Sequence, residues 1–332
     1  MQHADPAISG VTARLDRGRF WPLPRPRRAD GQLRATGIEI EFAGLSVETA
    51  GHVVAGTWGG RPVHETARTL RVSGTRLGDI KVELDISLGG ETAEWLVASA
   101  LGEAVPVEIV TPPVLPVDMP QVDALVAALR AAGARGTRDA LAFGFGVHLN
   151  PAVATEDAAF ILPVVRAYAL LEDWLRASDP IDLTRRLLPF VSPWPTALVD
   201  RLAAEGRGWG IDDLTANYLE LSPTRNRSLD LLPLLAHLRP TAVGAVLDKG
   251  KTKAPRPTFH YRLPEARVDE PDWSIAYEWN RWCVVERVAE RALLLADLAE
   301  AWLEHRSAYT SLRSDWAPEV EARLFEARIW DA

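Results

Sequence analysis

Gly37-Ile38-Glu39-Ile40-Glu41-Phe42 is the stretch that decides the fold of this chain. Side chains of a β-strand alternate between its two faces, so Glu39 and Glu41 share one face and the apolar side chains share the other. Neighbouring carboxylates repel each other and are rare within a sheet unless a divalent cation or an arginine compensates them. The stretch therefore predicts a strand with an apolar core face and a polar, functional face.

Four further segments alternate in the same way, and they cover residues 81–88, 107–110, 143–150 and 258–263. Their polar faces, with that of the first strand, carry Glu39, Glu41, Glu83, Asp85, Glu108, His148, Asn150, His260 and Arg262. A half-buried antiparallel sheet that faces water alternates as well, and this alternative stays open for each single strand. Several carboxylates with a histidine nevertheless form a ligand set suited to magnesium or manganese, ions that orient a triphosphate.

The composition limits the class of protein and its partners. The chain has 332 residues, 47% of them hydrophobic and 25% charged, which is typical of a globular protein. Its net charge of −8 argues against a nucleic-acid backbone as the main partner. The single cysteine, Cys283, fits a reducing compartment, and neither a signal peptide nor a membrane-spanning stretch is expected. We therefore expect a soluble, cytoplasmic protein.

Helical patterns separate the strands, and together they predict an α+β fold in which helices pack against a curved antiparallel sheet. The expected helices cover residues 118–134, 155–174, 180–190, 195–204, 212–221, 228–238, 273–305 and 318–329, with Thr155 as an N-cap. Residues 47–54 and 63–72 are short and weakly patterned. Residues 1–34 are rich in arginine and proline and predict an extended arm; residues 35–332 predict one domain with a helical insertion at about 155–240.

Five motifs in this order resemble the putative amidoligase family, over about residues 37–290. They are residues 37–42, Leu84-Asp85-Ile86-Ser87-Leu88, Val107-Glu108-Ile109-Val110-Thr111-Pro112, Gly146-Val147-His148-Leu149-Asn150 and Tyr261-Arg262-Leu263-Pro264. The resemblance implies a glutamine-synthetase-like catalytic fold and a carboxylate–amine ligase. In such a reaction, ATP phosphorylates a carboxylate, and an amine or ammonia attacks the acyl phosphate to form an amide.

The resemblance also implies roles for individual residues. Glu39, Glu41 and Glu108 would be metal ligands, and His148 would contact the metal or a phosphate. Asp85 would bind the amine or a metal, and Arg262 would stabilise the transferred phosphoryl group. The family has a glutamate two residues before its late arginine, where this chain has His260, a residue type that can also ligate a metal.

Basic residues outside the strands are candidates for nucleotide binding. Arg225, Arg227 and Arg267 are anion-binding candidates, with surface ion pairs as the alternative. Lys251 lies in a basic loop, residues 248–257, that would close over phosphates or remain an ordinary surface loop. The loop is no P-loop, because five residues separate Gly244 from Gly250 where four are required.

The function predicted from the sequence is an amide-forming ligase that uses ATP and magnesium or manganese. Its substrates would be a small-molecule or peptide carboxylate and an amine donor. Two alternatives remain: a guanidino kinase-like phosphotransferase, and a degenerate protein of the same fold that binds a ligand without turnover. Relatives of this fold often assemble, so a homo-oligomer is compatible with the sequence.

Overall fold

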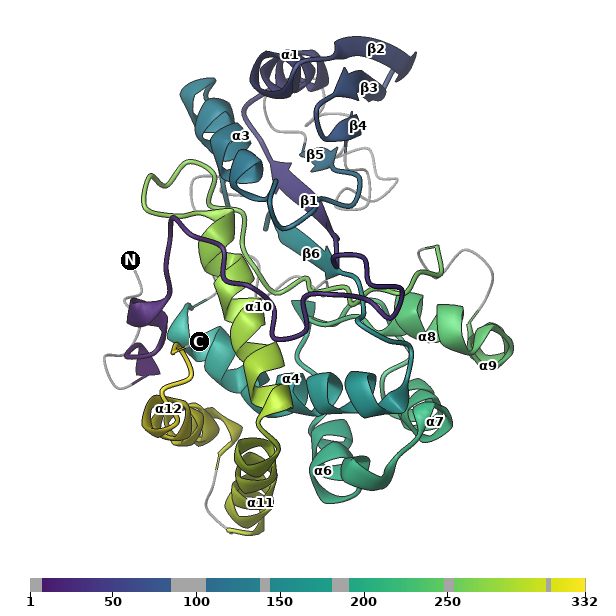
Figure 1. Cartoon of the computed structure of the whole chain (residues 1–332), viewed down its shortest axis with the longest axis vertical. Helices are drawn as coiled ribbons and strands as arrows, with labels where there is room; N and C mark the ends of the chain where they lie inside the picture. Colours follow the sequence, from purple (N-terminus) through teal and green to yellow (C-terminus); the bar gives the residue numbers. More distant parts are fainter. Residues whose placement is uncertain are drawn as a thin grey trace, which may run out of the picture.

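The computed structural model describes residues 8–84, 106–137, 144–180, 191–247, 254–308 and 312–331. Within them, six strands form one sheet in the order β2-β3-β4-β5-β1-β6, and every neighbouring pair is antiparallel. This confirms the predicted α+β fold with an antiparallel sheet (Figure 1). The strands are β1 (Thr36–Phe42), β2 (Arg61–Thr66), β3 (Thr69–Thr75), β4 (Gly78–Leu84), β5 (Val107–Val110) and β6 (Val147–Pro151).

The apolar face of the sheet is buried under two helices, α1 (Val47–Trp58) and α3 (Pro120–Ala131). Ile38, Ile40 and Phe42 of β1 have no exposed surface, as the alternation predicts. Helix α1 begins where the Ser46 side chain accepts a hydrogen bond from the Thr49 amide at 3.1 Å. The weakly patterned residues 47–54 are therefore helical, and residues 63–72 belong to the β2–β3 hairpin.

The remaining helices form a second layer below the sheet in Figure 1, with α4 (Ala158–Ser178) and α10 (Ile275–Glu290) at its centre. Around them lie α6 (Thr196–Ala204), α7 (Ile211–Leu221), α8 (Leu232–Leu238), α9 (Pro240–Val246), α11 (Ala292–Ser307) and α12 (Trp316–Glu326). Short 3-10 turns occupy Thr12–Arg14, Gly206–Gly208 and Arg313–Asp315. No helix in the described part of the chain is both long and apolar enough to cross a membrane.

The structure corrects several predicted boundaries. The predicted helix over residues 273–305 is two helices, because the backbone leaves the helical region at Arg291 (φ −98°, ψ 79°). Helix α4 begins after Asp157 rather than Thr155. Residues 180–190 lie outside the described residues except Pro180, which belongs to no helix. Of the strand predicted over residues 81–88, only 81–84 are described.

Residues 258–263 were predicted to be a strand, and they form none of the named strands. They run antiparallel along β6 through isolated bridges, Leu149 with Tyr261 and Ala152 with Thr258. On their other side, the Asp230 amide donates to the His260 carbonyl and the Arg262 amide to the Ser228 carbonyl. The segment is therefore held between β6 and residues 228–230 with an irregular register, which still places alternate side chains on the polar side.

Arm residues 15–34 lie along α10 (Figure 1), without a helix or strand of their own. Asn280 of α10 accepts from the Trp21 amide at 2.8 Å and donates to the carbonyls of Asp16 and Arg19. At the end of the arm, Arg34 forms a two-pronged ion pair with Glu286, with both N–O distances at 2.7 Å. Arg34 is fully buried, so the arm is fixed to the helical layer by a desolvated ion pair.

A titratable contact joins the two layers and gives a pH-dependent stability. Asp123 of α3 accepts hydrogen bonds from the Ile275 and Ala276 amides at the start of α10, at 2.6 and 3.3 Å. Burial raises the pKa of Asp123 from its ordinary value of 3.8 to about 6, although the two amides oppose this shift. The folded protein therefore holds a proton on Asp123 between these two values where the unfolded chain does not.

The free energy of unfolding should consequently fall as pH rises through this window, by roughly 3 kcal/mol from Asp123. We expect the wild type to lose free energy of unfolding relative to Asp123→Asn as pH rises from 4 to 7. Urea unfolding of both proteins at each pH measures this difference. A difference that shifts in favour of the wild type would mean that the amides of α10 stabilise the carboxylate more than burial destabilises it.

Candidate active site

The pairing of the strands aligns three glutamates across the polar face of the sheet. Glu41 lies opposite Glu108 in the β1–β5 pair, and Glu108 lies opposite Glu83 in the β4–β5 pair. Like charges directly opposite each other destabilise an antiparallel pair. Glu83 has a cation of its own, because Lys81 Nζ lies 2.7 Å from its carboxylate. Glu41, nearly fully buried, and Glu108, half-buried, remain side by side.

His148 connects this row to the next one. It lies opposite Glu39 in the β1–β6 pair, and its Nδ1 is 2.8 Å from Glu39 Oε2. Its Nε2 lies 3.4 Å from Glu41 Oε1, while the other Glu41 oxygen accepts the Gly146 amide at 2.7 Å. Both carboxylates and the imidazole are more than nine-tenths buried, so their interactions are weakly screened by water. One histidine thus lies between two buried carboxylates.

Asn150 places a second histidine beside the first. Its amide group donates to the Gly37 carbonyl and to Glu39 Oε1, at 3.2 and 3.1 Å, which orients its oxygen towards His260 Nδ1, 2.5 Å away. Because an amide oxygen only accepts, this contact favours a proton on His260 Nδ1, and in the neutral ring Nε2 would then carry the lone pair. The rings of His148 and His260 meet edge to face, 5.2 Å apart.

Two groups of side chains here could hold a divalent cation: Glu39 with His148 and His260, and Glu41 with Glu108 and His148. Within each group the donor atoms lie within 4.8 Å of one another. The second group, with two carboxylates and one imidazole, suits magnesium or manganese, and the first, with two imidazoles, favours manganese or another transition metal. The donor chemistry therefore fits a cation, and His148 belongs to both groups.

Three arginines lie beside this acidic cluster. Arg256 Nη2 lies 2.9 Å from Asn150 Oδ1, 3.5 Å from His260 Nδ1 and 3.6 Å from Glu39 Oε1. Arg262 donates to the Arg225 carbonyl at 2.6 Å. Burial lowers the pKa of Arg225, and Arg262 and Arg256 lower it further while Asp230 and Glu39 raise it. A basic cluster (Arg225, Arg256, Arg262) thus adjoins the acidic one.

The structure places the other predicted site residues as follows. Arg227 donates to Ser222 Oγ and to the Pro193 carbonyl, at 2.7 and 2.6 Å. Arg267 lies in an ion-pair cluster with Asp179 and Glu278. Asp85 and Lys251 lie outside the described residues. Glu39, Glu41, Glu108, His148 and His260 are brought together, with Arg225 and Arg262 beside them.

Two residues of the cluster were not among the predicted site residues. Asn150 shares the polar face with His148 by simple alternation, so its position was available from the sequence. Arg256 comes from a loop whose path no periodicity describes, and its contact with Glu39 and Asn150 depends on tertiary structure. Only its two flanking prolines, Pro255 and Pro257, marked the segment as extended.

Fold and site together define an α+β protein whose polar sheet face gathers carboxylates, histidines and arginines into one cluster. A family model described as a putative amidoligase enzyme matches residues 32–284, and the chain belongs to this family. The match confirms the resemblance seen in the sequence and supports a ligase-type enzyme that forms C–N bonds. No curated protein and no solved structure matches the chain. Every residue of the cluster lies within the matched range.

Proposed function

We propose that this protein is an ATP- and magnesium-dependent carboxylate–amine ligase that forms an amide through an acyl phosphate. The observation that carries the proposal is one cluster, inside the amidoligase family match, in which a candidate cation-binding set and a basic cluster meet. A metal–triphosphate complex needs both, because carboxylates hold the cation and arginines bind phosphate oxygens.

In the proposed reaction Glu41, Glu108 and His148 hold the divalent cation, with manganese as an alternative to magnesium. When bound, the cation neutralises charge on the phosphates. Glu39 accepts the His148 Nδ1 hydrogen and fixes the orientation of that ring. The guanidinium groups of Arg225, Arg256 and Arg262 contact the phosphoryl oxygens, where they stabilise charge that develops during transfer. Contacts of Lys251, Arg227 or Arg267 with the nucleotide are further parts of the proposal.

The chemistry balances in two steps. A carboxylate oxygen of the acid attacks the γ-phosphorus of ATP and ADP leaves, which gives the acyl phosphate. The amine nitrogen then attacks the acyl carbon, and inorganic phosphate leaves with the oxygen that came from the carboxylate. The attacking nitrogen releases one proton to solvent, and Asp85 would bind the amine or a metal. No protein nucleophile takes part.

The test is a substrate screen followed by isotope transfer. Pools of amino acids, peptides and other carboxylates are incubated with ATP, magnesium and an amine or ammonia, and amide products are identified by mass spectrometry. With an ¹⁸O-labelled carboxylate, the acyl-phosphate route places one ¹⁸O in the released inorganic phosphate. An N-phosphorylated product would instead support a guanidino kinase-like enzyme. Saturable ATP binding without ADP release on any pool would support a protein that has lost turnover.

A further inference from the structure

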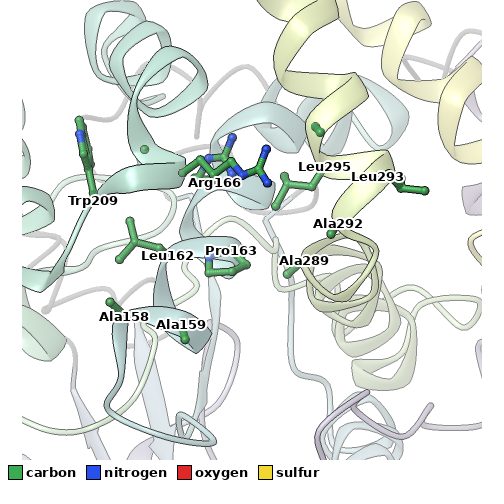
Figure 2. Close-up of a pocket in the computed structure, with 13 residues that line it drawn as sticks. Ala158, Ala159, Leu162, Pro163, Arg166, Trp209, Ala289, Ala292, Leu293 and Leu295 are labelled. Atoms are coloured by element: carbon green, nitrogen blue, oxygen red, sulfur yellow. The ribbon is translucent and has the colours of Figure 1, made fainter.

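A second hollow lies in the helical layer, between the start of α4, the turn Gly206–Gly208 with Trp209, and the junction of α10 and α11. Its volume is about 340 Å³, within the range of small-molecule sites. Most of the residues that line it are apolar, and in Figure 2 Trp209 and Leu295 lie on either side of Arg166, with Leu162 and Pro163 below. Its size and lining suit a small organic molecule.

Arg166 is the unusual residue of this hollow. The residue is 8% exposed, and among the described residues its one hydrogen bond runs from Nε to the Leu202 carbonyl at 3.1 Å. No carboxylate of the described residues lies within 4.0 Å of it. Burial lowers the pKa of Arg166, and the nearby Arg207 lowers it further. Within the described part of the chain, Arg166 is therefore a largely buried cation without a counter-ion, which costs free energy.

The other buried arginines of the described residues differ from Arg166. Arg34, Arg267 and Arg281 are paired with carboxylates. Arg287 donates to two backbone carbonyls and stacks on the Trp21 indole ring. The backbone also makes room for Arg166, because a Cβ at Gly206 would lie only 3.2 Å from Arg166 Cδ. The position of this guanidinium is thus built into the site.

A neighbouring hollow limits where the body of an anionic ligand can lie. It shares Arg166, Arg207 and Ala296 with the first, and it carries Glu300 and Glu304. Neither glutamate pairs with either arginine within the described residues. An anion beside Glu300 would be repelled, so the apolar hollow next to Trp209 is the favourable place for the body of an anionic ligand, with its charged group at Arg166 and Arg207.

We propose that the hollow between α4, Trp209 and α11 binds a small carboxylate with an apolar body, with Arg166 as the group that receives the carboxylate. The guanidinium fork matches the two carboxylate oxygens, and the ligand supplies the counter-ion that none of the described residues provides. The apolar body displaces water from the alanines and leucines of the wall.

This site is separate from the acidic cluster of the sheet. Ala158, Leu162 and Arg166 follow one another at helical spacing along one side of α4, and these residues line the hollow. Phe160, on another side of the same helix, packs on Phe259, next to His260. The two sites are therefore separated by α4, and a ligand at Arg166 does not need the proposed ligase activity to bind.

Isothermal titration calorimetry with sodium octanoate, at pH 7 on the full chain, tests the proposal. We expect saturable one-site binding, at least about tenfold weaker binding of the uncharged octanamide, and no detectable binding of acetate. Arg166→Met should weaken octanoate binding at least about tenfold, and the exposed Arg207→Met should weaken it severalfold. Arg201→Met is the matched control, because Arg201 lies outside the hollow and pairs with Glu220.

Urea unfolding separates a ligand site from a purely structural arginine. Since Arg166→Met removes an uncompensated buried charge, the urea midpoint should stay the same or rise. The proposal is overturned if octanamide binds as tightly as octanoate. It is also overturned if Arg166→Met leaves octanoate binding unchanged, and a fall of the urea midpoint in that variant would then mark Arg166 as purely structural. Absence of octanoate binding to the wild type would overturn it as well.

Discussion

Glu41→Gln is expected to lower magnesium-dependent ATP binding at least tenfold and to abolish measurable turnover, while the protein stays folded. Replacing a residue that merely orients a metal ligand lowers metal affinity or activity about 10- to 100-fold. Loss of a ligand charge should lower them at least as much. Glutamine keeps the volume of the side chain and an oxygen that can accept the Gly146 amide, which the structure places 2.7 Å from Glu41. The fold therefore loses little.

Glu83→Gln is the matched control for this experiment. Glu83 belongs to the same row of glutamates and lies opposite Glu108, but it is paired with Lys81 and belongs to neither candidate metal group. ATP binding by calorimetry with and without magnesium should be nearly unchanged in Glu83→Gln. Equal losses in the two variants would show that the general negative charge of the sheet face matters, and no loss in Glu41→Gln would refute the role given to Glu41.

Arg34→Ala is expected to lower the free energy of unfolding by about 3–5 kcal/mol, because it leaves Glu286 buried without its cation. Arg34 and Glu286 have side chains 0% and 2% exposed, and Arg34 also donates to the Ala152 carbonyl at 2.6 Å. Glu286 would retain the Trp282 indole as a donor at 2.8 Å, which cannot neutralise a carboxylate. Urea unfolding followed by circular dichroism measures the loss.

An exposed ion pair of the same arm is the natural control. Arg25 lies 2.7 Å from Glu290, and their side chains are 47% and 33% exposed. Arg25→Ala should cost no more than about 1 kcal/mol. The double variant Arg34→Met with Glu286→Met should recover most of the stability that Arg34→Ala loses, since it removes both buried charges. A loss below about 1 kcal/mol in Arg34→Ala would mean that water reaches Glu286.

The period-two pattern was enough to predict the faces of β1 and β6 and hence the convergence of Glu39 and His148. This succeeded because alternation is a local property of an extended chain, and a buried face fixes the register of its partner strand. Residues 258–263 alternate too, but their backbone hydrogen bonds are divided between β6 and residues 228–230. Such a division depends on the tertiary path of the chain, which alternation does not encode.

The basic side of the cluster was harder to predict for a related reason. Arg225 and Arg256 lie in irregular segments, so neither a helical nor a strand period indicates where their side chains point. Arg267, equally basic in the sequence, instead forms ion pairs with Asp179 and Glu278. The burial of Arg166 could not be predicted, because it lies in an amphipathic helix, where an isolated arginine usually faces solvent. Its burial becomes visible only when α6 and α11 are in place.

The Arg34–Glu286 pair has a consequence for how this molecule is made on the ribosome. The two residues are 252 positions apart, so at about 5–20 residues per second translation reaches Glu286 roughly 10–50 s after Arg34. The arm has no docking place on α10 before then. The arm is therefore synthesised well before its docking place and is among the last segments to settle, so its docking follows, rather than guides, the assembly of the sheet.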